Sequence, residues 1–354
     1  MTNTTVADCK VEERTLDREI KFGVGLPMSY STASNNNRFH EITSFALEAE
    51  KVGFDLVTTA DHVFIPYEAL SALTAIAFTT KRISIGTSVL DLNRRSPAVL
   101  AHVTATLDLI SNGRLMLGVG VGGGGGNRET WGSTIEKPVS RTVEVISALK
   151  KFWTEEKVDY AGSYFRFKNA NVAVKPTQKP HPPIWVAGFG PRMLKVTGEL
   201  GDGFVTQNVS PELFERDFTK VKENARKRGK DPDRIAGIFA APMAVASDYE
   251  KALRCVEGSA WGGFYGIRGA LYRHGGPPSH WAKFFGYDKP WESPAEVPME
   301  IVDKSCIFGT LDDCIGKIER YARKGVDYFV ALPLHPSGFE GLKVFSKVIG
   351  YFRN

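Results

Sequence analysis

The chain has 354 residues, of which 42% are hydrophobic and 24% charged, which is an ordinary composition for a globular protein. Its 45 basic and 40 acidic residues are interspersed and give a formal net charge of +5, a pattern that argues against a nucleic-acid partner. The four cysteines form no Cys-x-x-Cys pair, and no histidine or cysteine pair has the spacing of a metal site, so neither a disulfide framework nor a bound metal is expected.

The residues before the first apolar run, about 1–19, are polar and mixed in charge, and they lack the apolar core of a signal peptide. No apolar run in the sequence approaches the roughly 20 residues that cross a bilayer. We therefore expect a cytoplasmic protein with a polar N-terminal extension and no membrane partner.

From residue 20 onward, short apolar runs alternate with amphipathic stretches. The first run, 20–28, is followed by 39–53, where Ile42, Phe45 and Ala49 share one helical face and Gly53 ends the helix. The later runs, each with the amphipathic stretch that follows it, are 55–62 with 68–80, 83–90 with 96–111, 114–121 with 137–153, 183–190 with 192–201, 203–208 with 211–229, 235–246 with 248–256, and 327–334 with 341–352.

Two segments interrupt this alternation. Residues 158–176 are typical of a short hairpin, and about 255–305 form an insertion rich in glycine, proline and aromatic residues, after which 311–325 resume the helical pattern. Eight apolar runs, each followed by a helix, predict one (β/α)8 TIM barrel domain over 1–354, with the insertion before the last strand. A doubly wound parallel sheet is the alternative fold.

In an α/β barrel, ligands bind at the carboxyl ends of the strands, so the residues at those ends are the candidates for function. These residues are Gly25, Asp61 and His62, Ser88 and Val89, the glycines 122–126, Gly188 to Gly190, Gln207 and Asn208, and His335.

Five consecutive glycines, 122–126, follow the fourth apolar run and lead to Asn127. Glycine accepts positive φ and lets backbone N–H groups face a ligand, so the run is typical of a contact with an anion or a ring edge, the alternative being a slack loop. It lacks the Gly-x-Gly-x-x-Gly pattern with a later acid, so an NAD site is not indicated. Gly188 to Gly190 precede a helix beginning at Pro191, whose amino end favours an anion.

Asp61 and His62 are the one adjacent acid and histidine at a strand end. Histidine exchanges a proton near neutral pH, so His62 is the candidate catalytic acid–base residue, with Asp61 holding its ring in orientation. The alternative is a histidine that only packs against backbone.

Several motifs together resemble the bacterial luciferase-like superfamily of flavin and deazaflavin oxidoreductases. They are "ADH" (60–62), "IGTSVL" (85–90), the segment 94–120, "KPVSR" (137–141), "VDYAGSYFRF" (158–167), "PPIWVAGFGPRML" (182–194) and "GDGFV" (201–205). The similarity runs from about Phe22 to Phe352. It is greatest to the branch that uses coenzyme F420, which includes methylenetetrahydromethanopterin reductase.

The resemblance implies a cofactor site for F420, or alternatively FMN. It implies a non-prolyl cis peptide bond between Ser88 and Val89 beneath the cofactor ring, the Asp61–His62 pair beside that ring, and a phosphate cradle at Gly188 to Gly190. The cofactor-binding residues carried over are Gly25, Asp61, Thr87, Ser88, Val89, Gly122, Gly123, Gly124, Gly125, Gly126, Asn127, Ala187, Gly188, Phe189 and Gly190.

One departure concerns the proton donor. Several relatives place a glutamate after the first strand or in the loop after the fourth, where this chain has Gly25 and Gly123. His62 is therefore the candidate that remains, and Glu129 is a second.

The leading hypothesis is an F420-dependent oxidoreductase that moves a hydride between the deazaflavin and a C=O or C=N carbon of a small or pterin-like substrate. The alternatives are an FMN-dependent monooxygenase that needs a partner reductase, and a barrel that binds a flavin without catalysis. The resemblance also implies a homodimer that packs through helices early in the barrel. The insertion is expected to act as a lid over the substrate, the alternatives being a subunit contact or plain packing.

Overall fold

The computed structural model describes residues 19–27, 38–62, 65–122, 136–257, 297–335 and 338–353. The predicted N-terminal extension lies almost wholly outside these ranges. So do 123–127 of the glycine loop, Glu129, and 258–296, which make up most of the predicted insertion.

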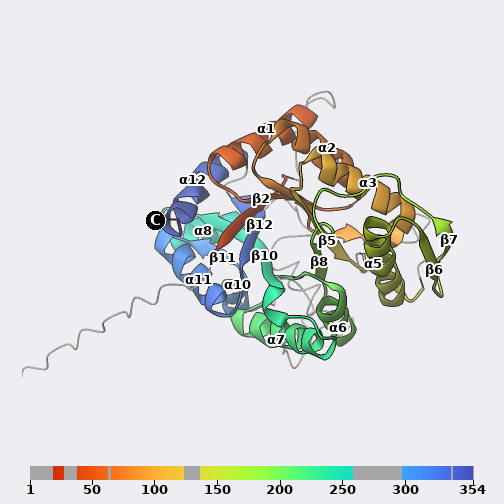
Figure 1. Ribbon diagram of the computed structural model, residues 1–354. Helices are drawn as coiled ribbons and strands as arrows, with labels where there is room; N and C mark the ends of the chain where they lie inside the picture. The colour runs from red at the N-terminus through yellow and green to blue at the C-terminus, as the bar shows by residue number, and fades with distance from the viewer. Residues whose placement is uncertain are drawn as a thin grey trace, which may run out of the picture.

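Eight parallel strands form a closed barrel in the described part of the chain (Figure 1). The strands are β1 (Lys21–Gly25), β2 (Leu56–Thr59), β3 (Ser84–Thr87), β5 (Leu115–Gly120), β8 (Ile184–Ala187), β9 (Gly203–Gln207), β10 (Ala236–Val245) and β12 (Tyr328–His335). Each strand pairs in parallel with its neighbour, and β10 pairs with both β9 and β12, which closes the circle. The predicted (β/α)8 barrel is thereby confirmed, and the doubly wound sheet was the wrong alternative.

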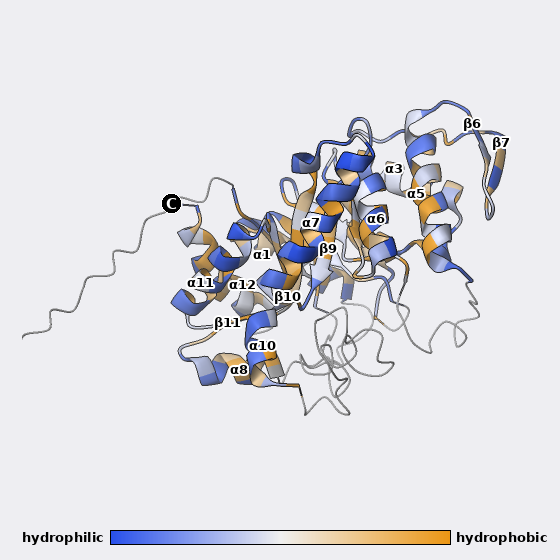
Figure 2. Cartoon of the chain, turned by 90° about the horizontal axis from the view of Figure 1, so that it is seen from below, coloured by the Kyte–Doolittle hydropathy of each residue, from blue (hydrophilic) through white to orange (hydrophobic). Residues whose placement is uncertain are grey.

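Helices surround the barrel and bury one face each against it. They are α1 (Arg38–Lys51), α2 (Ala69–Thr79), α3 (Pro97–Ile110), α5 (Pro138–Thr154), α6 (Pro191–Leu200), α7 (Pro211–Lys227), α11 (Leu311–Arg323) and α12 (Gly338–Tyr351). In Figure 2 the hydrophobic faces of α5 and α7 turn towards the strands and their hydrophilic faces turn outwards. After α1, Gly53 has a φ of +100°, the left-handed conformation expected of a residue that ends a helix.

The third predicted strand differs from the expectation. Instead of one strand over 83–90, β3 ends at Thr87, and a short strand β4 (Leu90–Asp91) continues the pairing with β5. The peptide bond between Ser88 and Val89, which separates the two strands, is cis. Asp91 then caps a 3-10 helix, Leu92–Arg94.

Two further parts lie at opposite ends of the barrel. The predicted hairpin is present as β6 (Val158–Ala161) and β7 (Arg166–Ala170), between α5 and the amino end of β8. At the carboxyl end of β10 lie α8 (Tyr249–Glu257), α10 (Met299–Ser305) and β11 (Ile307–Gly309), which pairs with β10 (Figure 2). The sequence did not indicate α10 or β11, because seven and three residues are too short to show a period.

The interior of the barrel is bulky at its amino end and has small residues at several positions nearer its carboxyl end. One cluster of inward-facing residues includes Leu56, Trp185, Ile238 and Val330, with Tyr328 packed against it. Side chains alternate along a strand, and several of the inward positions nearer the carboxyl ends are small. These positions are Gly25, Ala60, Gly86, Gly118, Gly120, Ala187 and Ala240. These small residues lie at the end where barrel enzymes bind ligands.

Candidate active site

Two glycines of β5 let the segment around the cis peptide bond pack directly against that strand. A Cβ added at Gly118 would lie 2.0 Å from the carbonyl oxygen of Thr87, and one at Gly120 would lie 3.0 Å from Cγ2 of Val89. The Thr87 hydroxyl also donates to the Gly118 carbonyl oxygen at 2.6 Å. Ser88 and Val89 remain half-buried at this end of the barrel, so they are open to a ligand.

Gly122, two residues after Gly120, packs against Asp91 in the same way. Its φ is +85°, and an added Cβ would lie 2.1 Å from Oδ2 of the buried Asp91 carboxylate. That carboxylate is fixed, because Oδ1 accepts from the Asn93 amide at 2.9 Å and Oδ2 lies 3.0 Å from Nε of Arg94. Asn93 in turn donates to the Val121 carbonyl oxygen at 3.1 Å. The first glycine of the run is thus required by packing and backbone conformation, whereas Gly123 to Asn127 lie outside the described residues.

Asp61, at the end of β2, joins that strand to the segment after the cis peptide bond. Its Oδ2 accepts from the Asp91 amide at 3.0 Å, and Arg95 donates to both carboxylate oxygens at 2.7 and 2.9 Å. Arg95 also bonds Glu68 at 2.8 Å, next to the start of α2. Burial raises the pKa of Asp61, but the hydrogen bonds and charge of Arg95 and the Asp91 amide hold it below its ordinary value. Asp61 is therefore an ionised residue that fixes the site.

His62 follows Asp61 directly and is half-buried at the carboxyl end of β2. Its acid–base role, and the expected role of Asp61 in orienting it, stay predictions. The pairing of Asp61 with Arg95 is an addition that the sequence did not indicate, because the two residues are 34 positions apart and no local pattern connects them.

At the end of β1, packing explains why Gly25 has no side chain. A Cβ there would lie 2.2 Å from Cδ2 of Leu332 and 3.3 Å from the carbonyl oxygen of Ala331, both in β12. A larger residue at position 25 would require Leu332 to move.

The end of β8 offers backbone to a ligand. Gly188 packs against Met193, with an added Cβ 2.3 Å from the Met193 Cβ, whereas an added Cβ at Gly190 meets nothing within 4 Å. Gly190 caps α6, and Arg192 in the first turn donates to the Ser140 hydroxyl of α5 at 3.1 Å. The N–H groups at a helix start, next to an arginine and a serine, suit an anionic group. Ala187 and Phe189 complete this half-buried edge.

Of the buried polar side-chain atoms without a hydrogen-bond partner among the described residues, two belong to residues in or directly after barrel strands. They are the hydroxyl oxygen of Thr58 in β2 and Oδ1 of Asn208 after β9, in residues that are 2% and 6% exposed. In the closed ring of eight strands, β2 and β9 lie opposite each other. Unpaired polar atoms at the end of the barrel where ligands bind are candidate contacts for the polar edge of a ligand. The sequence analysis named Asn208 as a strand-end residue but missed Thr58.

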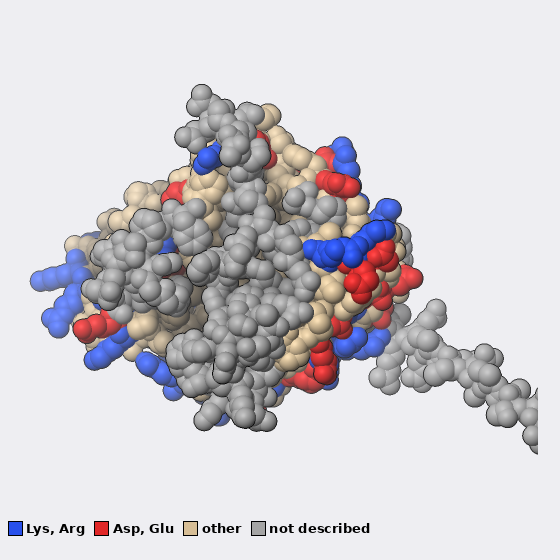
Figure 3. Space-filling model, turned by 180° about the vertical axis from the view of Figure 1, so that it is seen from behind, with Lys and Arg blue, Asp and Glu red and all other residues tan. Residues whose placement is uncertain are grey.

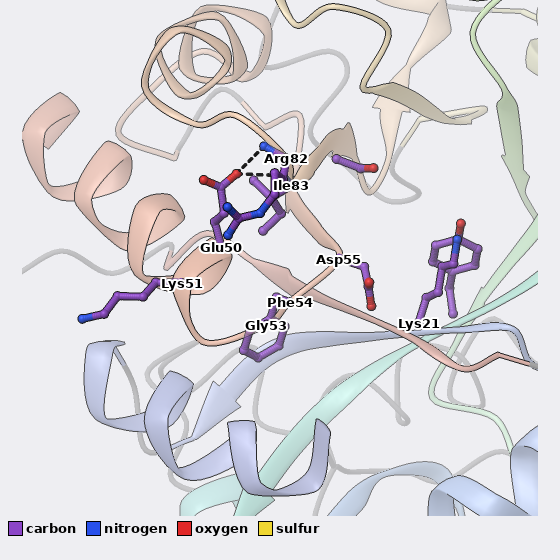
Figure 4. A pocket seen from close by; sticks show the side chains of 10 residues that line it. Lys21, Glu50, Lys51, Gly53, Phe54, Asp55, Arg82 and Ile83 are labelled. Atoms are coloured by element: carbon purple, nitrogen blue, oxygen red, sulfur yellow. Dashed lines mark hydrogen bonds between the residues drawn. The ribbon is translucent and has the colours of Figure 1, made fainter. Parts of the chain in front are cut away.

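A cavity of about 400 Å³ lies at the opposite, amino end of the barrel (Figure 4). Its acidic residues are engaged in the fold. Glu50 accepts from the amides of Arg82 and Ile83 at 2.6 and 2.8 Å, and Asp55 accepts from the Phe22 amide at 2.7 Å and from Arg353. The amino end of a barrel generally contributes stability instead of catalysis, so this cavity is not the candidate site.

Acidic and basic side chains are interspersed along the right-hand edge of the face in Figure 3. Within the described ranges, no helix is both long and apolar enough to span a membrane, and no group of three His, Cys, Asp or Glu residues is arranged to hold a metal ion.

Residues 20–328, most of the chain, match the family model described as luciferase-like monooxygenase. The chain belongs to this family. This confirms the resemblance inferred from the motifs around the strand ends.

Named relatives of this luciferase-like chain are redox enzymes. The F420-dependent glucose-6-phosphate dehydrogenase of Amycolatopsis mediterranei is 32% identical over 242 residues, which cover 64% of this chain and 72% of the relative. The 5,10-methylenetetrahydromethanopterin reductase of Methanolobus tindarius is 30% identical over 318 residues, which cover 87% and 95%. The luciferase-like chain is accordingly a flavin- or deazaflavin-dependent oxidoreductase.

Among solved structures, an F420-dependent secondary alcohol dehydrogenase in complex with an F420–acetone adduct aligns with a TM-score of 0.77. It is 24% identical, and the alignment covers 95% of the luciferase-like chain and 100% of that structure's chain. At this identity the alignment shows that the two proteins share a fold.

Replacing Gly122 with alanine tests the packing against Asp91. A non-glycine residue at positive φ costs about 1–3 kcal/mol, and the contact with the fixed Asp91 carboxylate adds to this cost. We expect a loss of at least about 2 kcal/mol in the free energy of unfolding, measured by urea denaturation. Gly316→Ala in α11 is the control, because an added Cβ there meets nothing within 4 Å. Equal stability of the two variants would contradict this account of Gly122.

Proposed function

We propose that the chain is an F420-dependent oxidoreductase that transfers a hydride between the deazaflavin and a carbonyl or imine carbon of a small or pterin-like substrate. One structural observation carries the proposal. Half-buried Ser88 and Val89, joined by a cis peptide bond, pack against Gly118 and Gly120 at the carboxyl end of the barrel, where Thr58 and Asn208 each hold a buried polar atom without a partner among the described residues. Two relatives whose names specify F420 or a pterin support the choice of cofactor and substrate class.

We assign two groups of residues to the two ends of the cofactor, one to the ring and one to the phosphate. Val89, held against Gly118 and Gly120, provides a surface for one face of the ring. The start of α6, with Gly190, Arg192 and neighbouring Ser140, suits the phosphate of the side chain. A bound deazaflavin supplies or accepts two electrons and one proton as a hydride. The protein fixes the distance and orientation between ring and substrate.

The second proton of the reaction requires a residue of the chain. When a hydride adds to a C=O or C=N carbon, the oxygen or nitrogen takes up a proton, and in the reverse reaction it loses one. His62 is the proposed donor and acceptor, because imidazole exchanges protons near neutral pH and the residue lies at the carboxyl end of β2. Asp61, paired with Arg95, holds the backbone before His62 in place.

An FMN-dependent monooxygenase on the same barrel is the second candidate, and the description of the family model favours keeping it. The two candidates share the same half-buried strand ends and differ in the ring that occupies them. A non-catalytic barrel is set aside, because the named relatives are enzymes.

Titration of the purified chain with F420 and with FMN distinguishes these candidates. We expect F420 to bind more tightly, with quenching of its fluorescence, and to be reduced when an alcohol or reduced pterin substrate from a panel is added. The measurements are the dissociation constant of each cofactor and the loss of F420 absorbance. Tight binding of FMN with no binding of F420 would overturn the proposal in favour of the monooxygenase.

Replacing His62 with alanine tests the proton transfer. Removal of a general acid–base group lowers turnover by roughly 10²–10⁴-fold. We expect a loss of kcat in this range while the dissociation constant of the cofactor changes little. His40→Ala, at an exposed position of α1, is the matched control. Unchanged turnover in the His62 variant would assign the proton to another group.

We also propose that the enzyme is a homodimer that packs through α2 and α3. Large apolar side chains on these helices are exposed to solvent, with Phe78 68%, Val99 58% and Leu109 57% exposed. Several large exposed apolar side chains on two neighbouring helices are a feature of protein–protein interfaces. Light scattering is expected to give twice the mass of one chain, and Phe78→Glu with Leu109→Glu is expected to give a monomer. A monomeric wild-type protein would contradict the proposal.

A further inference from the structure

The side chain of Thr58 faces the interior of the barrel. Leu56, two residues earlier in β2, belongs to the interior cluster, whereas Val57 belongs to the core between the strands and the helices. Because side chains alternate along a strand, Thr58 points to the same side as Leu56, and Thr59 points to the same side as Val57.

The neighbours of Thr58 in the sheet have no side chains. Its register partners are Gly25 in β1 and Gly86 in β3. Leu332 of β12 covers Gly25, as its close approach to an added Cβ at Gly25 indicates, and an added Cβ at Gly86 would meet the Met116 carbonyl oxygen. Thr58 therefore stands alone as a polar side chain between two glycines, at the end of the barrel proposed to hold the ring.

The hydroxyl of Thr58 is buried and lacks a hydrogen-bond partner among the described residues. The hydroxyls of other buried threonines do have partners. Thr87 donates to the Gly118 carbonyl oxygen and Thr104 donates to the Leu100 carbonyl oxygen, both at 2.6 Å. Leaving a buried hydroxyl unpaired reduces the stability of a fold, so an unpaired one requires an explanation, and a bound ligand is one.

We propose that the Thr58 hydroxyl binds the polar edge of the cofactor ring, by donating to a ring carbonyl oxygen or accepting from a ring N–H. A hydroxyl has one donor and two acceptor positions, so either contact is chemically available. The inference rests on the proposed function, because it places a deazaflavin or flavin ring at the carboxyl end of the barrel. It makes Thr58 a binding residue of the site.

The neighbouring Thr59 provides a matched control. Both threonines are 2% exposed and adjacent in β2, but Thr59 faces the helices and its hydroxyl donates to the Ala60 carbonyl oxygen at 3.3 Å. Substitution by valine removes the hydroxyl from either residue with little change in volume, so the two variants differ in what that hydroxyl contacts.

The experiment measures the melting temperature of the protein without cofactor and the dissociation constants of F420 and FMN. For Thr58→Val we expect an equal or higher melting temperature, because an unpaired hydroxyl is removed, and binding of the preferred cofactor about 5- to 10-fold weaker. Thr58→Ser keeps the hydroxyl and is expected to bind the cofactor as the wild type does. For Thr59→Val we expect the opposite pattern, with a lower melting temperature and unchanged binding.

The outcomes separate this inference from the proposed function. If the wild type binds a cofactor and Thr58→Val binds it equally well, the contact does not exist and only the inference is overturned. A lower melting temperature of Thr58→Val without cofactor, together with unchanged binding, would assign the hydroxyl a structural partner. A wild-type protein that binds neither cofactor overturns the inference and the proposed function together.

Discussion

The candidate site depends on one constraint. Alternate residues of β5 and of the two residues after it pack against alternate residues of the segment around the cis peptide bond. Gly118, Gly120 and Gly122 pack against Thr87, Val89 and Asp91. An added Cβ would clash at Gly118 and Gly122 and would be tight at Gly120. Through Asp91 the contact reaches Asp61, which accepts from the Asp91 amide. Gly118 and Gly120 in β5, together with Gly122 after it, therefore position the segment around the cis peptide bond.

Much of the fold was predictable from the sequence, because each barrel strand is an apolar run and each outer helix has an apolar face with a period of 3.6 residues. The third strand was not, since the residues of "IGTSVL" predict one continuous strand and the cis bond at Ser88 followed only from the family resemblance. Short elements were also missed. The strand Ile307–Gly309 exists because it pairs with the end of β10, which is a tertiary cause that three residues do not reveal.

Sequence reasoning identified residues of the candidate site at the ends of the strands and missed the residues that lie elsewhere. Asp61, Ser88, Val89 and Gly190 lie where the barrel rule places them, because that rule depends only on where strands stop. Arg95 was missed because its partner lies on another strand. Thr58 was missed because threonine is an ordinary strand residue, and only the structure reveals that its hydroxyl has no partner in the described part of the chain.

The packing at Gly25 has a consequence for enzyme engineering. A designer who wished to install a carboxylic acid at the tip of the first strand would find the required volume filled by the δ-methyl of Leu332 on the adjacent strand. The two positions form one steric unit, so a useful change has to shorten one side chain as it lengthens the other. Evolution faces the same coupling, and a lineage carrying this leucine can gain an acid here only if the leucine moves or is replaced.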